Sequence, residues 1–197
     1  MKLHVPPPLS ADLSWVHFLV LNLLLRMPLT PPPPIDLGWW GDASTSFSVG
    51  IVLGSHWAVW KWAPGFMVGP QMIYDISCAK AIAIELGLRV AISLHFLSPN
   101  PVGGYTFLVC SDNIGVVMVT NKGHSHSQEM NKILKHIYLL QAQHQIRLKA
   151  VHVASQNNIS DTLSCGSITE FLASFPSINA QISIPLLNDL VGKPVPL

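Results

Sequence analysis

Three strand-like runs follow one another near the start of the chain, at 37–45, 47–54 and 56–62. The turns between them are short, and short turns let successive strands pair antiparallel, so we expect a three-stranded meander. The period then changes, because apolar residues recur at spacings of three and four over 72–96, which is typical of a helix. A meander followed by a long helix restricts the chain to a sheet with helix packed on its face.

The rest of the chain alternates between strand and helix patterns. The continuous apolar run "YTFLVCSD" indicates a buried strand, and the stretch "NIGVVMVTNKG" indicates a short helix closed by Gly123. In order, we expect a strand at 105–112, a helix at 113–123, a helix at 126–145, a strand at 146–153 and a short helix within 157–166. The sequence therefore predicts an α/β fold: a mixed five-stranded sheet, with a three-strand antiparallel meander plus two parallel strands, and helices on both faces.

The composition favours a folded domain with a weak charge. Apolar residues make up 49% of the 197 residues and charged residues 11%, which argues against disorder. The net charge is +1, so no basic field covers the whole chain. Between 61 and 149, eight Lys or Arg residues stand against four Asp or Glu residues. Four lysines are candidates for phosphate contacts, although as surface residues they need no function: Lys61, Lys122, Lys132 and Lys135.

Cysteine and histidine spacing argues against a disulfide framework or a zinc site. Cys78, Cys110 and Cys165 are odd in number, widely spaced and without a CxxC pair. The histidines of "HSH" at 124–126 have no cysteine or carboxylate spaced nearby as a co-ligand. This usage favours a reducing intracellular compartment, cytoplasmic or nuclear.

Composition also divides the chain into three parts. We expect an N-terminal helix and a Pro-rich linker over 1–36, a domain over 37–166, and a tail without strong pattern over 167–197. The apolar run at 15–25 has eleven residues, whereas a membrane span needs about 20. We therefore expect no membrane segment there, but a short helix that packs on the domain or on a neighbour.

Three carboxylates lie at positions where they could form a metal-binding site. Asp42 lies within the first strand, Asp112 ends the fourth, and Asp161 opens the last short helix. If strands one and four are neighbours, the first two face each other and Asp161 approaches from the rim. Clustered carboxylates repel one another, and a divalent cation such as Mg²⁺ removes that conflict. Each aspartate also has a structural alternative: Asp42 as an edge-strand turn residue, and the other two as helix caps together with Asn113 and Asn158.

The segments "GWWGDASTSFSVGIVLGSHWAVWKW", "SDNIGVVMVTNKG" and "VHVASQNNISDTLSCG" resemble one known family. They are similar to the ribonuclease H-type domain of fungal retroelements that carry a reverse transcriptase and a tyrosine recombinase. The matching patterns are a "DAS…G.G" strand pair, a strand ending in "DN" with a following "KG" turn, and an "N..AD.LSR" helix start. The resemblance covers roughly 37–166.

The resemblance implies a ribonuclease H-like fold and a metal-dependent reaction. In the family, two Mg²⁺ ions (Mn²⁺ also serves) held by four carboxylates cleave the RNA strand of an RNA–DNA hybrid, one ion activating water and the other stabilising the leaving oxygen. Asp42, Asp112 and Asp161 occupy three of the four ligand positions. A metal-dependent DNA nuclease or integrase of the same superfamily is an alternative, which the first-strand motif disfavours.

The fourth ligand position departs from the family pattern. The family's Glu lies on the first long helix, three residues before a small residue, and this frame places Lys80 at the Glu position and Ala83 at the small one. Glu85, the nearest carboxylate, lies five residues further on, about 140° around the helix from Lys80. Either the helix register differs and Glu85 is the fourth catalytic and metal ligand, or the Glu is lost. In the second case the Lys80 ammonium replaces the metal, and the chain is a degenerate remnant that keeps the fold and at most binds nucleic acid.

Overall fold

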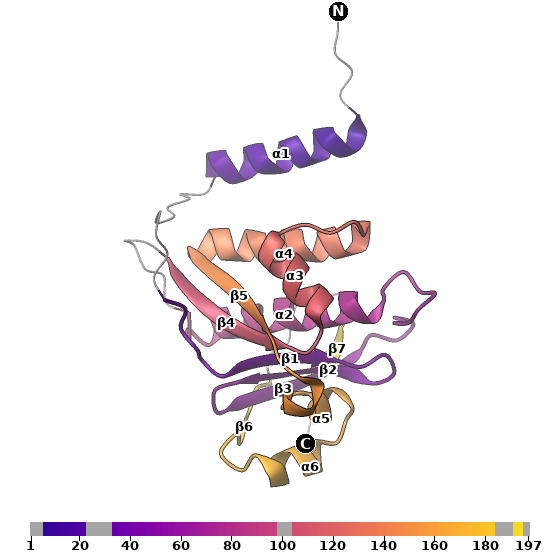
Figure 1. The fold of residues 1–197 in the computed structure, drawn as a ribbon, viewed down its shortest axis with the longest axis vertical. Coiled ribbons are helices and arrows are strands. Elements are labelled where there is room, and N and C mark those ends of the chain that lie inside the picture. Colours follow the sequence, from indigo (N-terminus) through magenta and orange to yellow (C-terminus); the bar gives the residue numbers. More distant parts are fainter. Residues whose placement is uncertain (1–5, 23–32, 98–103, 184–190, 195–197) are drawn as a thin grey trace, which may run out of the picture.

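A computed structural model describes residues 6–22, 33–97, 104–183 and 191–194. Its first element, α1 (Pro7–Asn22), lies on the outer side of α4, and Asp12 of α1 forms an ion pair with Lys135 of α4 (Figure 1). It begins at Pro7, and proline suits the first turn of a helix because its backbone has no N–H to leave unpaired there. None of the helices within the described residues has the length and apolar character that crossing a membrane requires.

A mixed sheet forms the centre of the fold. Its strands lie in the order β5-β4-β1-β2-β3, with the first three strands of the chain antiparallel and the other two parallel to β1. The bounds are β1 (Trp39–Ala43), β2 (Ser48–Leu53), β3 (His56–Trp62), β4 (Tyr105–Ser111) and β5 (Ile146–His152). The predicted meander with two parallel strands is confirmed.

Helices cover both faces of this sheet, as predicted (Figure 1). One face carries α2 (Ile76–Ser93), α3 (Ile114–Lys122) and α4 (Gln128–His144). The other face carries α5 (Asp161–Ser164) and α6 (Ile168–Ser174), and a 3₁₀ turn at Ser155–Asn157 precedes them. The residues just before α2, α3 and α4 accept hydrogen bonds through their side chains from the backbone of the first turn, which fixes where each helix begins; these caps are Asp75, Asn113 and Ser127.

The residues after 166 have more structure than their sequence indicates. Besides α6 they form two short strands, β6 (Ala180–Gln181) and β7 (Val191–Pro194), which both pair with β3. Over the described residues the sheet therefore has seven strands, and the predicted number of five was wrong. Phe171 and Ile182 are buried in the two hydrophobic cores. The sequence showed no strong pattern here because segments of two to seven residues are too short for a period to be visible, and long-range packing holds them.

The sheet separates two hydrophobic cores. The larger lies against α2, α3 and α4, and the smaller lies against α5 and α6. Trp39, Trp57 and Trp60 are fully buried in these cores. These three side chains therefore serve packing and present no surface on which a base could stack.

Candidate functional site

The pairing of β1 with β4 brings the first two aspartates together. Trp40 is in register with Cys110, so Asp42 and Asp112, each two residues further along parallel strands, lie at the same level of the sheet. Asp42 is buried in a strand flanked by β2 and β4, which excludes the edge-strand alternative. Asn113, and not Asp112, caps α3 by accepting a hydrogen bond from the backbone of the first turn.

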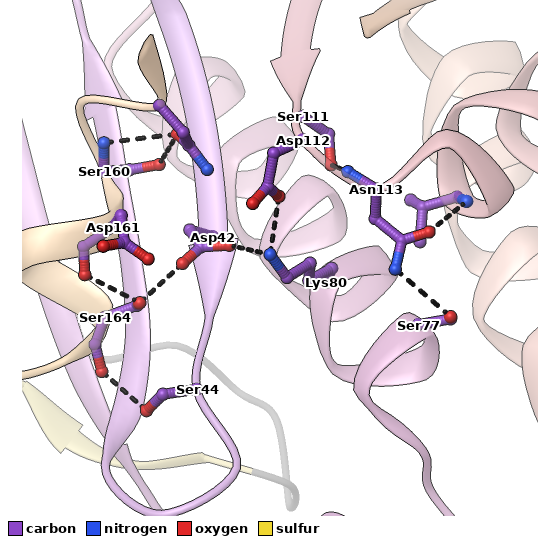
Figure 2. A network of polar contacts seen from close by, with 12 residues as sticks. Asp42, Ser44, Ser77, Lys80, Ser111, Asp112, Asn113, Ser160, Asp161 and Ser164 are labelled. Atoms are coloured by element: carbon purple, nitrogen blue, oxygen red, sulfur yellow. Dashed lines mark hydrogen bonds and ion pairs between the residues drawn. The ribbon is translucent and has the colours of Figure 1, made fainter. Parts of the chain in front are cut away.

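Helix α2 packs closely on β1 because both contact positions are small. A Cβ atom at Gly41 would lie 3.4 Å from the Cβ of Ala83. Lys80, one turn earlier on the same helix face, is thereby directed at the aspartates. Its Nζ lies 2.7 Å from Asp42 Oδ1 and 2.5 Å from Asp112 Oδ1 (Figure 2).

Helix α5 approaches the opposite side of the same point. A Cβ at Gly50 of β2 would lie 2.7 Å from the Cβ of Leu163, so the helix can sit this close only over a glycine. Ser164 of α5 donates a 2.6 Å hydrogen bond from Oγ to Asp42 Oδ2. Asp161 lies one turn earlier at the exposed rim, beside Asp42 (Figure 2).

A group of serines ties α5 to the β1–β2 hairpin. The hydroxyls of Ser44 and Ser48 both donate to the backbone carbonyl of Ser164, at 2.7 and 2.9 Å. In the loop before α5, Ser160 donates from Oγ to Asn158 Oδ1 at 2.7 Å. Sequence reasoning missed these roles; the one available signal was that Ser164 follows Asp161 by one helical turn.

Lys80 carries a charge that the site itself maintains. Burial lowers the pKa of Lys80, but its hydrogen bonds and charge interactions with Asp112 and Asp42 outweigh burial and raise the pKa above its usual value. The side chain is therefore an ammonium at neutral pH. One positive charge lies among three carboxylates.

The other two aspartates affect the pKa of Asp161. Its pKa is raised, first by partial burial and then by the negative charges of Asp42 and Asp112, while Lys80 opposes the rise. The three aspartates therefore share one electrostatic environment, although they come from distant parts of the chain.

Glu85 lies elsewhere on α2. Its carboxylate is buried and accepts two hydrogen bonds from Arg89, at 2.6 Å from Nη2 and 3.0 Å from Nε. Nδ1 of His136 on α4 lies 3.6 Å away. The structure thus brings Asp42, Asp112 and Asp161 together with Lys80, and it places Glu85 on the side of α2 that meets α4.

The residues present do not fit a divalent metal ion at this point. Within the described residues, no group of three His, Cys, Asp or Glu side chains is arranged to hold one. Asp42 Oδ2 accepts a hydrogen bond from Ser164, and Oδ1 is occupied by the Lys80 ammonium at 2.7 Å. A cation between Asp42 and Asp112 would need the place that Nζ occupies.

Comparisons with known proteins gave structural neighbours only. No model of a known protein family matches the chain, and no curated protein matches it. The crystal structure of RNase H1 from the halophilic archaeon Halobacterium salinarum is similar at a TM-score of 0.47 and 14% identity, over 70% of this chain and 99% of that one. The N-terminal RNase H domain of a Mycobacterium tuberculosis protein, solved as a fusion with maltose-binding protein, is similar at a TM-score of 0.42 and 16% identity, over 69% of this chain and 94% of that one.

Proposed function

We propose that this chain is a ribonuclease H-type nucleic-acid-binding domain whose ligand is an RNA–DNA hybrid. The observation that carries the proposal is the convergence of Asp42, Asp112 and Asp161, from three motifs far apart in the sequence, at one point of a mixed sheet. The order of the motifs supports an origin in a fungal retroelement. The three cysteines are free, which supports an intracellular setting, cytoplasmic or nuclear.

The proposed domain binds the hybrid without cutting it. The ancestral reaction implied by the resemblance is endonucleolytic cleavage of the RNA strand with two Mg²⁺ ions, or Mn²⁺ in their place. In this chain Lys80 holds Asp42 and Asp112, and Glu85 is paired with Arg89. These contacts support the degenerate form of the domain over the active enzyme.

Charge indicates which lysines contact phosphates. Lys80 offsets only one of the three carboxylate charges, so the aspartate cluster repels a phosphate. Lys132 and Lys135 are engaged in ion pairs with Glu129 and Asp12. Lys61 and Lys122 are exposed, the former 5.3 Å above the ring of Phe47. We assign the phosphate contacts to these two lysines.

A binding and cleavage assay on one sample tests the proposal. The full chain is mixed with a short labelled RNA–DNA hybrid in Mg²⁺, Mn²⁺ or EDTA, binding is followed by fluorescence anisotropy, and the RNA is then run on a denaturing gel. We expect binding that weakens with salt, that is unchanged by EDTA and that leaves the RNA intact. Lys61→Glu and Lys122→Glu weaken binding, whereas the matched variant Lys135→Glu does so less.

Two results contradict the proposal in different ways. Absence of binding to the hybrid at low salt removes the nucleic-acid function altogether. Mg²⁺-dependent cleavage of the RNA that disappears in Asp42→Asn would show that the domain is an active nuclease, which contradicts the proposal of a non-cleaving domain. Duplex DNA and single-stranded RNA, tested as competitors, show whether the hybrid is the preferred ligand.

A further inference from the structure

The Lys80 ion pairs are buried, unlike the other lysine pairs of the fold. The exposed fractions of the side chains are 12% for Lys80, 2% for Asp42 and 8% for Asp112. In the Lys132–Glu129 pair the lysine is 67% exposed. Exposed pairs contribute little to stability, whereas a buried carboxylate that loses its partner is strongly unfavourable.

The position of the ammonium is fixed from several sides. The close contact between Ala83 and Gly41 fixes the helix that carries Lys80. Asp42 is held from the opposite face of the sheet by the hydroxyl of Ser164. Its remaining oxygen, Oδ1, lies 2.7 Å from the Lys80 ammonium and has no other polar partner among the described residues. A cation is therefore required at this point, and the chain supplies it from its own side chain.

We infer that the Lys80 ammonium is a built-in replacement for a divalent cation. It stays paired with both buried carboxylates and offsets one of their two charges, so divalent ions neither bind between Asp42 and Asp112 nor contribute to the stability of the fold. The inference deepens the proposed function because it concerns the same site. It is measured without nucleic acid, so it stands or falls separately from binding of the hybrid.

The replacement has a consequence for a chain that lacks the ammonium. Lys80→Met keeps most of the side-chain length and removes the charge, which leaves two buried carboxylates facing each other. These carboxylate oxygens are hard ligands of the kind that Mg²⁺ and Mn²⁺ prefer. The variant is therefore expected to depend on a divalent ion for stability, in contrast to the unmodified chain.

Thermal unfolding with and without Mn²⁺ tests this directly. The full chain, Asp42→Asn, Lys80→Met, Lys80→Met combined with Asp42→Asn, and Lys149→Met as a surface control are each unfolded in EDTA and in excess Mn²⁺. Free Mn²⁺ is measured in parallel by electron paramagnetic resonance. We expect the Tm of the unmodified chain and that of Lys149→Met each to be the same in both conditions, with no uptake of Mn²⁺.

The Lys80 variants carry the second half of the test. Lys80→Met is expected to lose about 5 °C or more of Tm in EDTA, to regain part of it in Mn²⁺ and to take up the ion. The double variant is expected to lose the Mn²⁺ response, because one of the two carboxylates is gone. If Lys80→Met folds in neither condition, the measurements on the unmodified chain still decide the inference.

Two outcomes overturn the inference. In the first, Mn²⁺ raises the Tm of the unmodified chain but not that of Asp42→Asn. The ion would then bind beside Lys80. The second is a Lys80→Met variant that is as stable as the unmodified chain in EDTA, since the ammonium is then not needed at this point. Neither outcome bears on whether the domain binds a hybrid.

Discussion

Ser164 Oγ donates a hydrogen bond to Asp42 Oδ2 across the face of the sheet, over 2.6 Å. Both residues are almost completely buried. The bond joins α5 to the central strand β1 and satisfies the carboxylate oxygen that Lys80 does not reach. Asp42 is thus held by a hydroxyl from one layer of helices and by an ammonium from the other.

Ser164→Ala is expected to lower the free energy of unfolding by about 1–3 kcal/mol, because it leaves a buried carboxylate oxygen without a donor. Urea denaturation measures the loss. Ser48→Ala is the matched control, since its buried hydroxyl donates to neutral backbone carbonyls; its cost is expected to be nearer about 1 kcal/mol. Equal costs for the two variants contradict the role assigned to the Ser164–Asp42 bond.

Gly50→Ala tests the close approach of α5 to β2. The added Cβ would lie 2.7 Å from the Cβ of Leu163 and 2.8 Å from the backbone nitrogen of Ser164, so the helix must move. We expect a loss of about 1–3 kcal/mol in urea denaturation. Gly69→Ala, whose added Cβ makes only an ordinary contact at 3.6 Å, is expected to have little effect. A neutral Gly50→Ala is incompatible with the described packing.

Arg89→Ala probes the buried carboxylate of Glu85. The change leaves Glu85 without its main partner, and we expect a loss of about 3 kcal/mol in the free energy of unfolding. Adding Glu85→Gln to that variant removes the unpaired charge and should recover part of the loss. If the double variant is less stable than Arg89→Ala alone, unpaired charge is not the cause of the loss.

Asp161→Asn should stabilise the chain slightly at neutral pH. The pKa of Asp161 is raised in the fold by burial and by Asp42 and Asp112, so its ionised form is disfavoured relative to the unfolded chain. That penalty is absent well below the unfolded pKa of about 3.9 and is fully present above the raised folded pKa. Because Asp161 is exposed, we expect a gain of only a few tenths of a kcal/mol.

A pH series of urea denaturations checks the sign of the Asp161 effect. The difference in stability between Asp161→Asn and the unmodified chain should grow as the pH rises through the acid range and stay constant at neutral pH. A difference that grows as the pH falls instead contradicts the raised pKa.

Cysteine labelling at pH 8 should separate Cys165 from Cys78. Cys165 is exposed, whereas burial, with the charge of Asp75 adding to it, raises the pKa of the Cys78 thiol to about 11. Thiolates are the reactive form, so iodoacetamide followed by mass spectrometry should find Cys165 modified first and Cys78 modified only after unfolding. Cys165→Ser should remove the fast reaction. Rapid labelling of Cys78 in the folded chain is incompatible with its described burial.

The sequence predicted those elements that carry a period over many residues. The meander, the two parallel strands and helices α2 to α4 lie where periodicity and capping residues indicated, with bounds that shift by a few residues. The sequence placed Asp42 opposite Asp112 on the condition that the first and fourth strands are neighbours, and β1 does pair with β4. The frame that aligned Lys80 with Ala83 agrees with the observed contact of Ala83 with Gly41.

Other features depend on contacts that no local pattern encodes. The serine hydroxyls around Ser164 acquire their partners only when α5 reaches the hairpin of β1 and β2. The partners of Glu85 depend on how α2 rotates against α4, which brings Arg89 and His136 to the same carboxylate. The strands after 166 are too short to show alternation and exist through their pairing with β3.

The pairing of β6 and β7 with β3 affects whether the chain stays monomeric. With β6 and β7 in place, the backbone amide and carbonyl groups on the outer side of β3 are occupied at both ends of the strand. A shortened chain ending at Gly166 would retain Asp42, Asp112, Asp161 and Lys80, yet its strand β3 would have an unpaired outer edge. An unpaired edge strand is a template on which further copies of the chain can add. We therefore expect such a fragment to aggregate in solution before its site could be tested.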